Sequence, residues 1–137
     1  MRIIAALVVA AAPAAAQQSS SSFEAGKALP LASGQWAYFT TAGGSIATYG
    51  NHIQLRCDRT TRTVTISRPI GAPAALTIAT DTSTRTLPPS GRLLASDLLL
   101  DAIAYSRGRF IVSGGTGPTI AVPSWPEAAR SIEDCRN

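Results

Sequence analysis

Several residue types are scarce in this chain of 137 residues, and their scarcity excludes whole classes of site. There are one histidine and two cysteines, too few for most zinc sites and for any histidine-rich metal centre. Only 15% of the residues are charged, which is low for a disordered tail. Beyond the N-terminal region, no run approaches the roughly 18 apolar residues of a spanning helix. We therefore expect one small globular domain without a metal ion or another cofactor.

The N-terminus has the three-part pattern of a secretory signal peptide. Arg2 gives a positive start, and an uninterrupted apolar run follows over 3–12. A proline ends that run, and the small residues Ala14–Ala16 form a cleavage site before Gln17. The pattern predicts a signal peptide over 1–16, cleaved near Ala16–Gln17, and a periplasmic or secreted protein. The alternative interpretation is a buried N-terminal helix.

Residues 17–33 are mostly small and polar, with four consecutive serines, and they predict a flexible N-terminal lead. The remaining residues, 34–137, are expected to form a single domain. Basic residues outnumber acidic ones, but the arginines are dispersed and no aromatic run lies between them. We therefore expect no nucleic acid partner, and a mildly basic surface that favours anionic partners.

Export would place the two cysteines in an oxidising compartment, where cysteines pair as disulfides. With two cysteines only one pairing exists, Cys57 with Cys135. The alternative is a reactive thiol pair, but the sequence has no C-x-x-C signature. A disulfide that closes a loop of about 80 residues stabilises a fold by up to roughly 4.5 kcal/mol in the chain-entropy model.

Alternation of apolar and polar residues predicts an antiparallel sheet with one solvent-facing side. The pattern is clearest where Ile53, Leu55 and Cys57 alternate with polar residues. Residues 45–49 fit either a short strand or a loop. The other expected strands are Gln35–Thr40, Val64–Ile66, Leu76–Ile78, Arg85–Leu87, Phe110–Val112 and Thr119–Val122.

Two helices are expected in the second half of the chain. Asp97–Tyr105 is polar only at positions 97 and 101, so it predicts a largely buried helix with Ser96 as its N-cap. Gly108 is placed to stop that helix. Ser124–Glu127 has the pattern of a capping box and predicts the start of a C-terminal helix.

Apolar residues recur along the C-terminal helix at the spacing of one helix face. They are Trp125, Ala128, Ala129 and Ile132, and Cys135 lies at the edge of the same stripe. Since Cys57 points inward from its strand, both cysteines reach the helix–sheet interface. The expected fold class is therefore α+β: an antiparallel sheet of about six strands, one buried helix near 97–105, and a C-terminal helix stapled to the sheet.

The sequence predicts no catalytic site. Asp97 and Asp101 lie one helical turn apart, which fits acid–base chemistry or, as we favour, a solvated stripe near a helix N-terminus. His52 lies on the outward face of a strand, and the sequence has no G-x-S-x-G nucleophile elbow. Residues 114–117 are rich in glycine but have no following lysine, so we expect a hairpin turn there rather than a phosphate-binding loop.

The most distinctive polar stretch is Tyr105–Phe110, where Arg107 and Arg109 flank Gly108. An exposed pair of guanidinium groups suits a carboxylate or an acidic partner, so both arginines are candidate partner-binding residues. The alternative is that the two arginines pair internally. Their acceptors would then be Asp101, Glu133 or Asp134.

Several stretches together resemble a group of uncharacterised exported proteins from alphaproteobacteria of the sphingomonad type. The matching stretches are Leu55–Asp58, Leu99–Phe110, Val122–Glu127 and Glu133–Arg136. The resemblance implies an exported domain and no particular activity. In its plan of an export signal, a cysteine-bearing strand and a late cysteine, the chain is also similar to type VI secretion accessory proteins and invasion-associated locus B proteins.

Ser106–Phe110 also resembles, in residue types but not in order, the serine–glycine–aromatic loop of periplasmic lysozyme inhibitors. We therefore expect a non-enzymatic accessory or interaction module that is periplasmic or secreted. Its partner would be an envelope protein or an anionic envelope component. The alternatives are an inhibitor of an envelope-targeting hydrolase such as a lysozyme and, more weakly, a small hydrolase that depends on His52.

Overall fold

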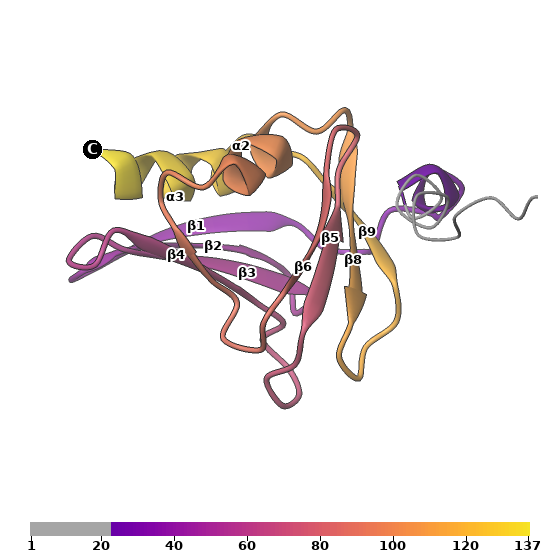
Figure 1. Cartoon of the computed structure of the whole chain (residues 1–137), viewed down its shortest axis with the longest axis horizontal. Coiled ribbons are helices and arrows are strands. Elements are labelled where there is room, and N and C mark those ends of the chain that lie inside the picture. Colours follow the sequence, from indigo (N-terminus) through magenta and orange to yellow (C-terminus); the bar gives the residue numbers. More distant parts are fainter. Residues whose placement is uncertain (1–22) are drawn as a thin grey trace, which may run out of the picture.

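The computed structural model describes residues 23–137, and the expected signal peptide over 1–16 lies outside them. The strands form two antiparallel sheets (Figure 1). The five-stranded sheet has the order β1 (Trp36–Thr41), β2 (Gly44–Tyr49), β3 (Ile53–Asp58), β4 (Thr63–Ser67) and β7 (Arg92–Leu94). The four-stranded sheet has the order β6 (Thr84–Leu87), β5 (Leu76–Ala79), β8 (Arg109–Gly114) and β9 (Ile120–Pro123).

The two sheets meet at a steep angle, and two helices fill the space between them (Figure 1). These helices, α2 (Leu98–Ala104) and α3 (Pro126–Arg136), lie on one face of the five-stranded sheet. One hydrophobic core draws on both sheets and both helices. Leu55 of β3, Phe110 of β8 and Ile132 of α3 are almost fully buried in it. The helices and the two inner sheet faces therefore share one apolar interior.

The register of β3 shows how alternation builds this interior. Leu55 lies opposite Ala47 of β2 and Ile66 of β4, and all three side chains are buried. Arg56, the next residue, is exposed on the outer face, as the period of two requires. The α+β class, the antiparallel pairing and the helix held to the sheet by a disulfide are confirmed.

The described chain has nine strands, more than the six expected, and they form two sheets rather than one. Residues 45–49, which fitted a strand or a loop, form most of β2, and β7 was not expected. β7 brings the chain back beside β4 after the excursion through β5 and β6. Gly91 permits this return: its φ is +62°, and a Cβ there would collide with the carbonyl oxygen of Ile66.

Residues 23–33 differ from the flexible lead expected over 17–33, because they pack on the four-stranded sheet. Residues 23–27 are helical, and Phe23 is buried against Ile111 and its neighbours on the outer face of that sheet. The Ala32 N–H then donates to the Ala121 carbonyl at 2.9 Å. The rest of the expected lead, residues 17–22, lies outside the described residues. The folded domain therefore begins no later than Phe23.

The two helices begin differently from expectation. Asp97, not Ser96, caps α2, and its carboxylate accepts a hydrogen bond from the Leu99 N–H. The N-cap of α3 is Trp125, and no side chain caps that helix, so the expected Ser124–Glu127 capping box is wrong. Pro126 at the first position has no N–H to satisfy, which lowers the need for a cap.

The two tryptophans have different environments. Trp125, expected on the apolar face of the C-terminal helix, is 48% exposed and lies at the N-cap of α3, one residue before the helix. Trp36 of β1 is buried instead, and its Nε1–H donates to the Pro123 carbonyl at 2.7 Å. This bond ties β1 to the end of β9 where the two sheets meet. Within residues 23–137, no helix is long and apolar enough to cross a membrane.

Candidate interaction surface

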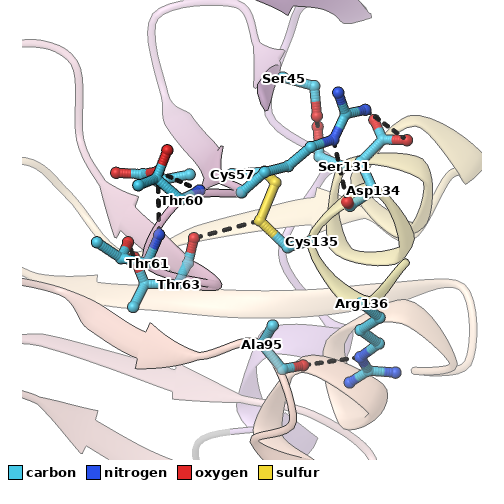
Figure 2. Close-up of a disulfide and its surroundings, with 12 residues drawn as sticks. Ser45, Cys57, Thr60, Thr61, Thr63, Ala95, Ser131, Asp134, Cys135 and Arg136 are labelled. Atoms are coloured by element: carbon cyan, nitrogen blue, oxygen red, sulfur yellow. Dashed lines mark hydrogen bonds and ion pairs between the residues drawn. A yellow bond between two sulfur atoms is a disulfide. The ribbon is translucent and has the colours of Figure 1, made fainter. Parts of the chain in front are cut away.

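The disulfide predicted from the sequence is present and joins β3 to α3 (Figure 2). Cys57 and Cys135 are 78 residues apart in the chain, with their Cα atoms 5.6 Å from each other. Both residues are buried, so the bond lies inside the helix–sheet interface rather than at the surface. Its place and its burial indicate a structural role.

Polar side chains surround the disulfide on the side facing β1 and β2. Ser45 and Ser131 are fully buried and their hydroxyls are hydrogen-bonded at 3.1 Å (Figure 2). Beside them the Tyr38 hydroxyl donates a short hydrogen bond to Asp134. Arg59 also approaches this carboxylate, with Nη2 3.7 Å from Oδ1. Asp134 therefore connects α3 to β1 and to the β3–β4 turn.

The environment of Asp134 favours its ionised form. Partial burial alone would raise the pKa of Asp134. Hydrogen bonds from Tyr38 and Ser45 and the positive charges of Arg59 and Arg130 outweigh this burial, and they lower the pKa below its ordinary value. The carboxylate is thus a charged acceptor within a structural network.

The other carboxylates considered for chemistry are also held in internal contacts. Asp97 accepts from Arg85 at 2.7 Å, and Asp101 accepts from Arg136 at 2.7 Å. Burial would raise the pKa of Asp97, but the hydrogen bonds from Arg85 and from the Leu99 N–H, with the Arg85 charge, lower it. The two side chains bind different partners, an arrangement that fixes α2 between β6 and α3.

Within residues 23–137, His52 makes no hydrogen bond to a carboxylate or a hydroxyl that would make it a general base. Its Nε2 lies 2.9 Å from the carbonyl oxygen of Ser33, and its ring packs near Tyr49. No group of three or more metal-binding side chains occurs in the part of the chain that the structure describes. Neither observation favours the small-hydrolase hypothesis.

The structure separates the two arginines predicted as partner-binding residues. Arg109 lies in β8, and its Nη1 donates to the carbonyls of Gly26 and Leu29 at 3.1 and 2.7 Å. Arg109 therefore fixes the end of the N-terminal helical segment on the sheet. The side chain of Arg107 is 93% exposed and lies 3.8 Å from Asp81 at its nearest approach. Neither arginine pairs with Asp101, Glu133 or Asp134, the acceptors considered from the sequence. Of the two, Arg107 is the one that projects into solvent.

The turn that presents Arg107 is braced from inside. Ser106 is buried, and its hydroxyl donates to the Arg109 carbonyl at 2.6 Å while accepting from the Asp81 N–H at 3.2 Å. Gly108 has a φ of +75°, a conformation that favours glycine. The turn between α2 and β8 is therefore tied to the β5–β6 turn.

A second feature of this region was not expected from the sequence. Leu98 and Tyr105, at the two ends of α2, are 80% and 77% exposed, the highest values among the large apolar residues described. Both lie on the face of α2 that carries Asp101, while Leu99, Leu100 and Ile103 are buried as predicted. The signal was present: Leu98, Asp101 and Tyr105 have the i, i+3, i+7 spacing of one helix face.

A hollow of about 490 Å³ lies along this face of α2. Its lining includes Leu98 and Tyr105 together with the polar side chains of Asp81, Ser83, Arg85 and Asp101. We call Leu98, Tyr105, Arg107 and this hollow the α2 surface. It combines exposed apolar side chains with an exposed cation, both on a braced framework.

Comparisons with known proteins assign no family to the chain. No family model, no curated protein and no solved structure matches it. The resemblances described from the sequence therefore remain predictions, and any function rests on the residues themselves.

Proposed function

We propose that this chain is a non-enzymatic interaction module, periplasmic or secreted, that binds an envelope protein through the α2 surface. The observation that carries the proposal is the exposure of Leu98 and Tyr105 on one face of α2, beside the freely projecting Arg107. Exposed apolar side chains grouped in this way are typical of a protein-binding site.

The residue types of the α2 surface support this proposal. Tyrosine and arginine are enriched among the side chains that dominate binding energy at protein interfaces. Tyr105 and Leu98 flank a hollow into which a partner side chain fits. Arg107 approaches Asp81 only at 3.8 Å and is 93% exposed, so it can pair instead with a carboxylate of the partner. Arg85, which lines the hollow, is already held by Asp97 at 2.7 Å, so it loses little conformational entropy on binding.

Site-specific photocrosslinking in the native host tests the proposal. A photoreactive phenylalanine analogue replaces Tyr105 in one variant and Leu98 in another, and the control variant carries it at Phe39. Phe39 is 54% exposed but lies in β1, outside the α2 surface. We expect the same adduct mass from positions 98 and 105, and none from position 39.

A substitution shows whether the adduct reports binding. Arg107→Ala is expected to reduce the adduct at position 105 by roughly tenfold, because a charge-assisted contact contributes about 1.5–3 kcal/mol. The melting temperature should stay unchanged, since this side chain is 93% exposed. Equal adducts at positions 39 and 105, or none at either α2 position, would contradict the proposal.

The braced turn Ser106–Arg109 favours one alternative function, inhibition of an envelope-targeting hydrolase such as a lysozyme. An inhibitory loop needs a fixed shape, and Ser106 supplies this by binding both Asp81 and Arg109. A lysozyme activity assay with the purified protein separates the two functions. Inhibition that Arg107→Ala abolishes would favour the inhibitor; unchanged lysis would favour the interaction module.

A further inference from the structure

The outer face of the five-stranded sheet, turned away from α2 and α3, is covered by neither helix (Figure 1). One row of side chains crosses it, because the strand register places neighbours in sequence from β1 to β7. The row consists of Phe39, Ile46, Arg56, Thr65 and Arg92. Phe39, Arg56 and Arg92 are exposed. The row is therefore apolar at β1 and basic at β3 and β7.

The unpaired positive charge of the described chain is concentrated on this sheet. Every other basic side chain in residues 23–137 has a carboxylate, a carbonyl or an aromatic ring as its partner. Arg56, Arg62 and Arg92 have none of these. Arg56 and Arg92 both neighbour Thr65, two strand spacings apart, so about 10 Å separates their Cα atoms.

A hollow of about 490 Å³ lies beside this pair, between the sheet and three loops. Its polar lining consists of Gln54, Thr65, Ser67, Arg68, Ser90 and Thr116. Arg68 donates from Nη2 to the Pro118 carbonyl at 2.8 Å, but its Nε is buried and has no hydrogen-bond partner. A buried donor without a partner costs free energy that a ligand acceptor would recover.

We propose that this outer-sheet hollow binds an acidic glycan. Arg56 and Arg92 at its rim hold the carboxylates of the glycan, and the hydroxyl and amide side chains of the lining hold the sugar hydroxyls. Serine, threonine and glutamine side chains both donate and accept, as vicinal sugar hydroxyls require. The apolar rim, with the exposed Ile70, contacts the C–H faces of the sugar rings.

The shape of the site favours a glycan over other anions. An acidic peptide added as a strand needs a free sheet edge, whereas this hollow is on the face of central strands β3 and β4. A lipid surface contacts groups that project from a protein, whereas Arg68 and the polar lining lie in a recess. The site lies across the five-stranded sheet from α2, so glycan binding leaves the α2 surface free (Figure 1).

Titration calorimetry with three probes of equal length tests the proposal. The probes are tetragalacturonate, neutral cellotetraose and tetraglutamate. The protein is purified from host cells after any processing of its N-terminus. We expect tetragalacturonate to bind, and both the neutral glycan and the acidic peptide to bind at least tenfold more weakly. Equal binding of tetraglutamate would overturn the assignment to a glycan, and no binding of tetragalacturonate would overturn the site.

Paired substitutions locate the binding. Arg56→Ala and Arg92→Ala are each expected to weaken binding by about tenfold, the loss of one charge-assisted hydrogen bond. Arg85→Ala with Arg107→Ala removes two positive charges, twice the loss in each test variant, from another part of the molecule and should change binding less than twofold. If this control weakens binding as strongly, net charge and not the hollow is responsible, and the proposal fails.

Gln54→Ala keeps the experiment decisive if an arginine variant is unstable. Gln54 is a lining residue of β3 whose side chain carries no charge. Its removal should weaken tetragalacturonate binding by roughly threefold to tenfold, the value of a neutral hydrogen bond. A Gln54→Ala variant with unchanged affinity would show that the sugar is held elsewhere.

Discussion

At the scale of single residues, Asp134 joins three separate parts of the fold. Its carboxylate accepts from Tyr38 of β1 and pairs with Arg59 beyond β3, while its backbone belongs to α3. Arg130, one turn earlier, lies over the Tyr38 ring at 4.1 Å. The charge on Asp134 therefore contributes to holding α3 on the sheet, in addition to the disulfide.

We predict that Asp134→Asn destabilises the protein at neutral pH and not in acid. The folded pKa of Asp134 lies below its unfolded value of about 3.9, so ionisation stabilises the fold above that pH. This stability is lost as the pH falls through the folded pKa. Urea unfolding at pH 7 should show a loss of about 1–3 kcal/mol, and the variant and the natural protein should converge in acid.

Glu133→Gln is the matched control for this pH dependence. Glu133 is the neighbouring carboxylate on α3, 56% exposed, and contacts only Arg136 at 3.4 Å. Its substitution should leave the free energy of unfolding within about 0.5 kcal/mol of the natural protein, both at pH 7 and in acid. If Asp134→Asn leaves the loss of stability in acid unchanged, this pH dependence belongs to Asp97, whose pKa is also lowered.

Residue-level prediction from the sequence succeeded where a residue's own strand or helix fixes its direction. Cys57 and Leu55 point inward because a strand alternates, and no other information is needed. It failed where a neighbouring element decides. Leu98 and Tyr105 are apolar, but nothing packs on their side of α2. Arg109 is held by two backbone carbonyls, and no pattern in the sequence marks which carbonyls will be near.

At the scale of elements, the helical start of the N-terminal segment, residues 23–29, depends on Arg109 from the sheet. Arg109 donates to the carbonyls of Gly26 and Leu29, and Phe23 and Leu29 pack in a small apolar cluster. Residues 32 and 33 have hydrogen bonds of their own, which do not involve Arg109. A Cβ on Gly26 would collide with Ile111, so this turn lies close against β8.

We predict that Arg109→Ala loosens this segment without unfolding the domain. Hydrogen exchange followed by mass spectrometry should show faster exchange over 23–29, because the helical turn loses the side chain that holds it on β8, and unchanged exchange in the five-stranded sheet. Arg107→Ala is the control, since its side chain is almost wholly solvated. Unchanged exchange over 23–29 in the Arg109 variant would show that the apolar contacts of Phe23 and Leu29 hold the turn without it.

The C-terminal helix depends on the disulfide in a similar way. α3 has eleven residues, a length at which isolated helices are marginal. We predict that Cys57→Ser with Cys135→Ser destabilises the domain by roughly 2–5 kcal/mol, because the closed loop no longer restricts the unfolded chain. Amide protection in α3 should fall before protection in β2 to β4.

Urea unfolding and hydrogen exchange of the double variant measure both effects. Asp134 and the Ser45–Ser131 hydrogen bond remain in this variant, so they define how much docking survives without the covalent bond. A loss below 1 kcal/mol, with α3 as protected as before, would assign the docking of α3 to these polar contacts and to Ile132.

At the scale of the whole molecule, the sequence predicted the class but not the division into two sheets. Alternation marks strands and their buried side, but β2 and β7 follow glycines and are short in apolar signal. The corner between the sheets depends on contacts such as Trp36 to Pro123, 87 residues apart. The outer-sheet hollow arises from this corner, since its lining comes from both sheets. Such long-range placements leave no periodic mark in the sequence.

The packing of residues 23–33 restricts where export processing can cut the chain. Phe23 is 7% exposed and anchors the segment on the sheet. Cleavage downstream of Phe23 would remove this side chain and expose the apolar surface of Ile111 that it covers. The small residues Ala14–Ala16 lie upstream of this limit. We predict that N-terminal sequencing of the exported protein starts at or near Gln17, with Phe23 retained.

Sequencing is combined with a cleavage-site variant to test this limit. Ala16→Leu removes the small residue before the expected site and should leave the precursor uncut or shift the new terminus to another position before Phe23. A natural terminus beyond Phe23 would contradict the packing argument, because the exposed apolar strip on β5, β8 and β9 would then face solvent. An intact Met1 in the cytosol would contradict export. The disulfide would then also be unexpected, because disulfides persist in oxidising compartments.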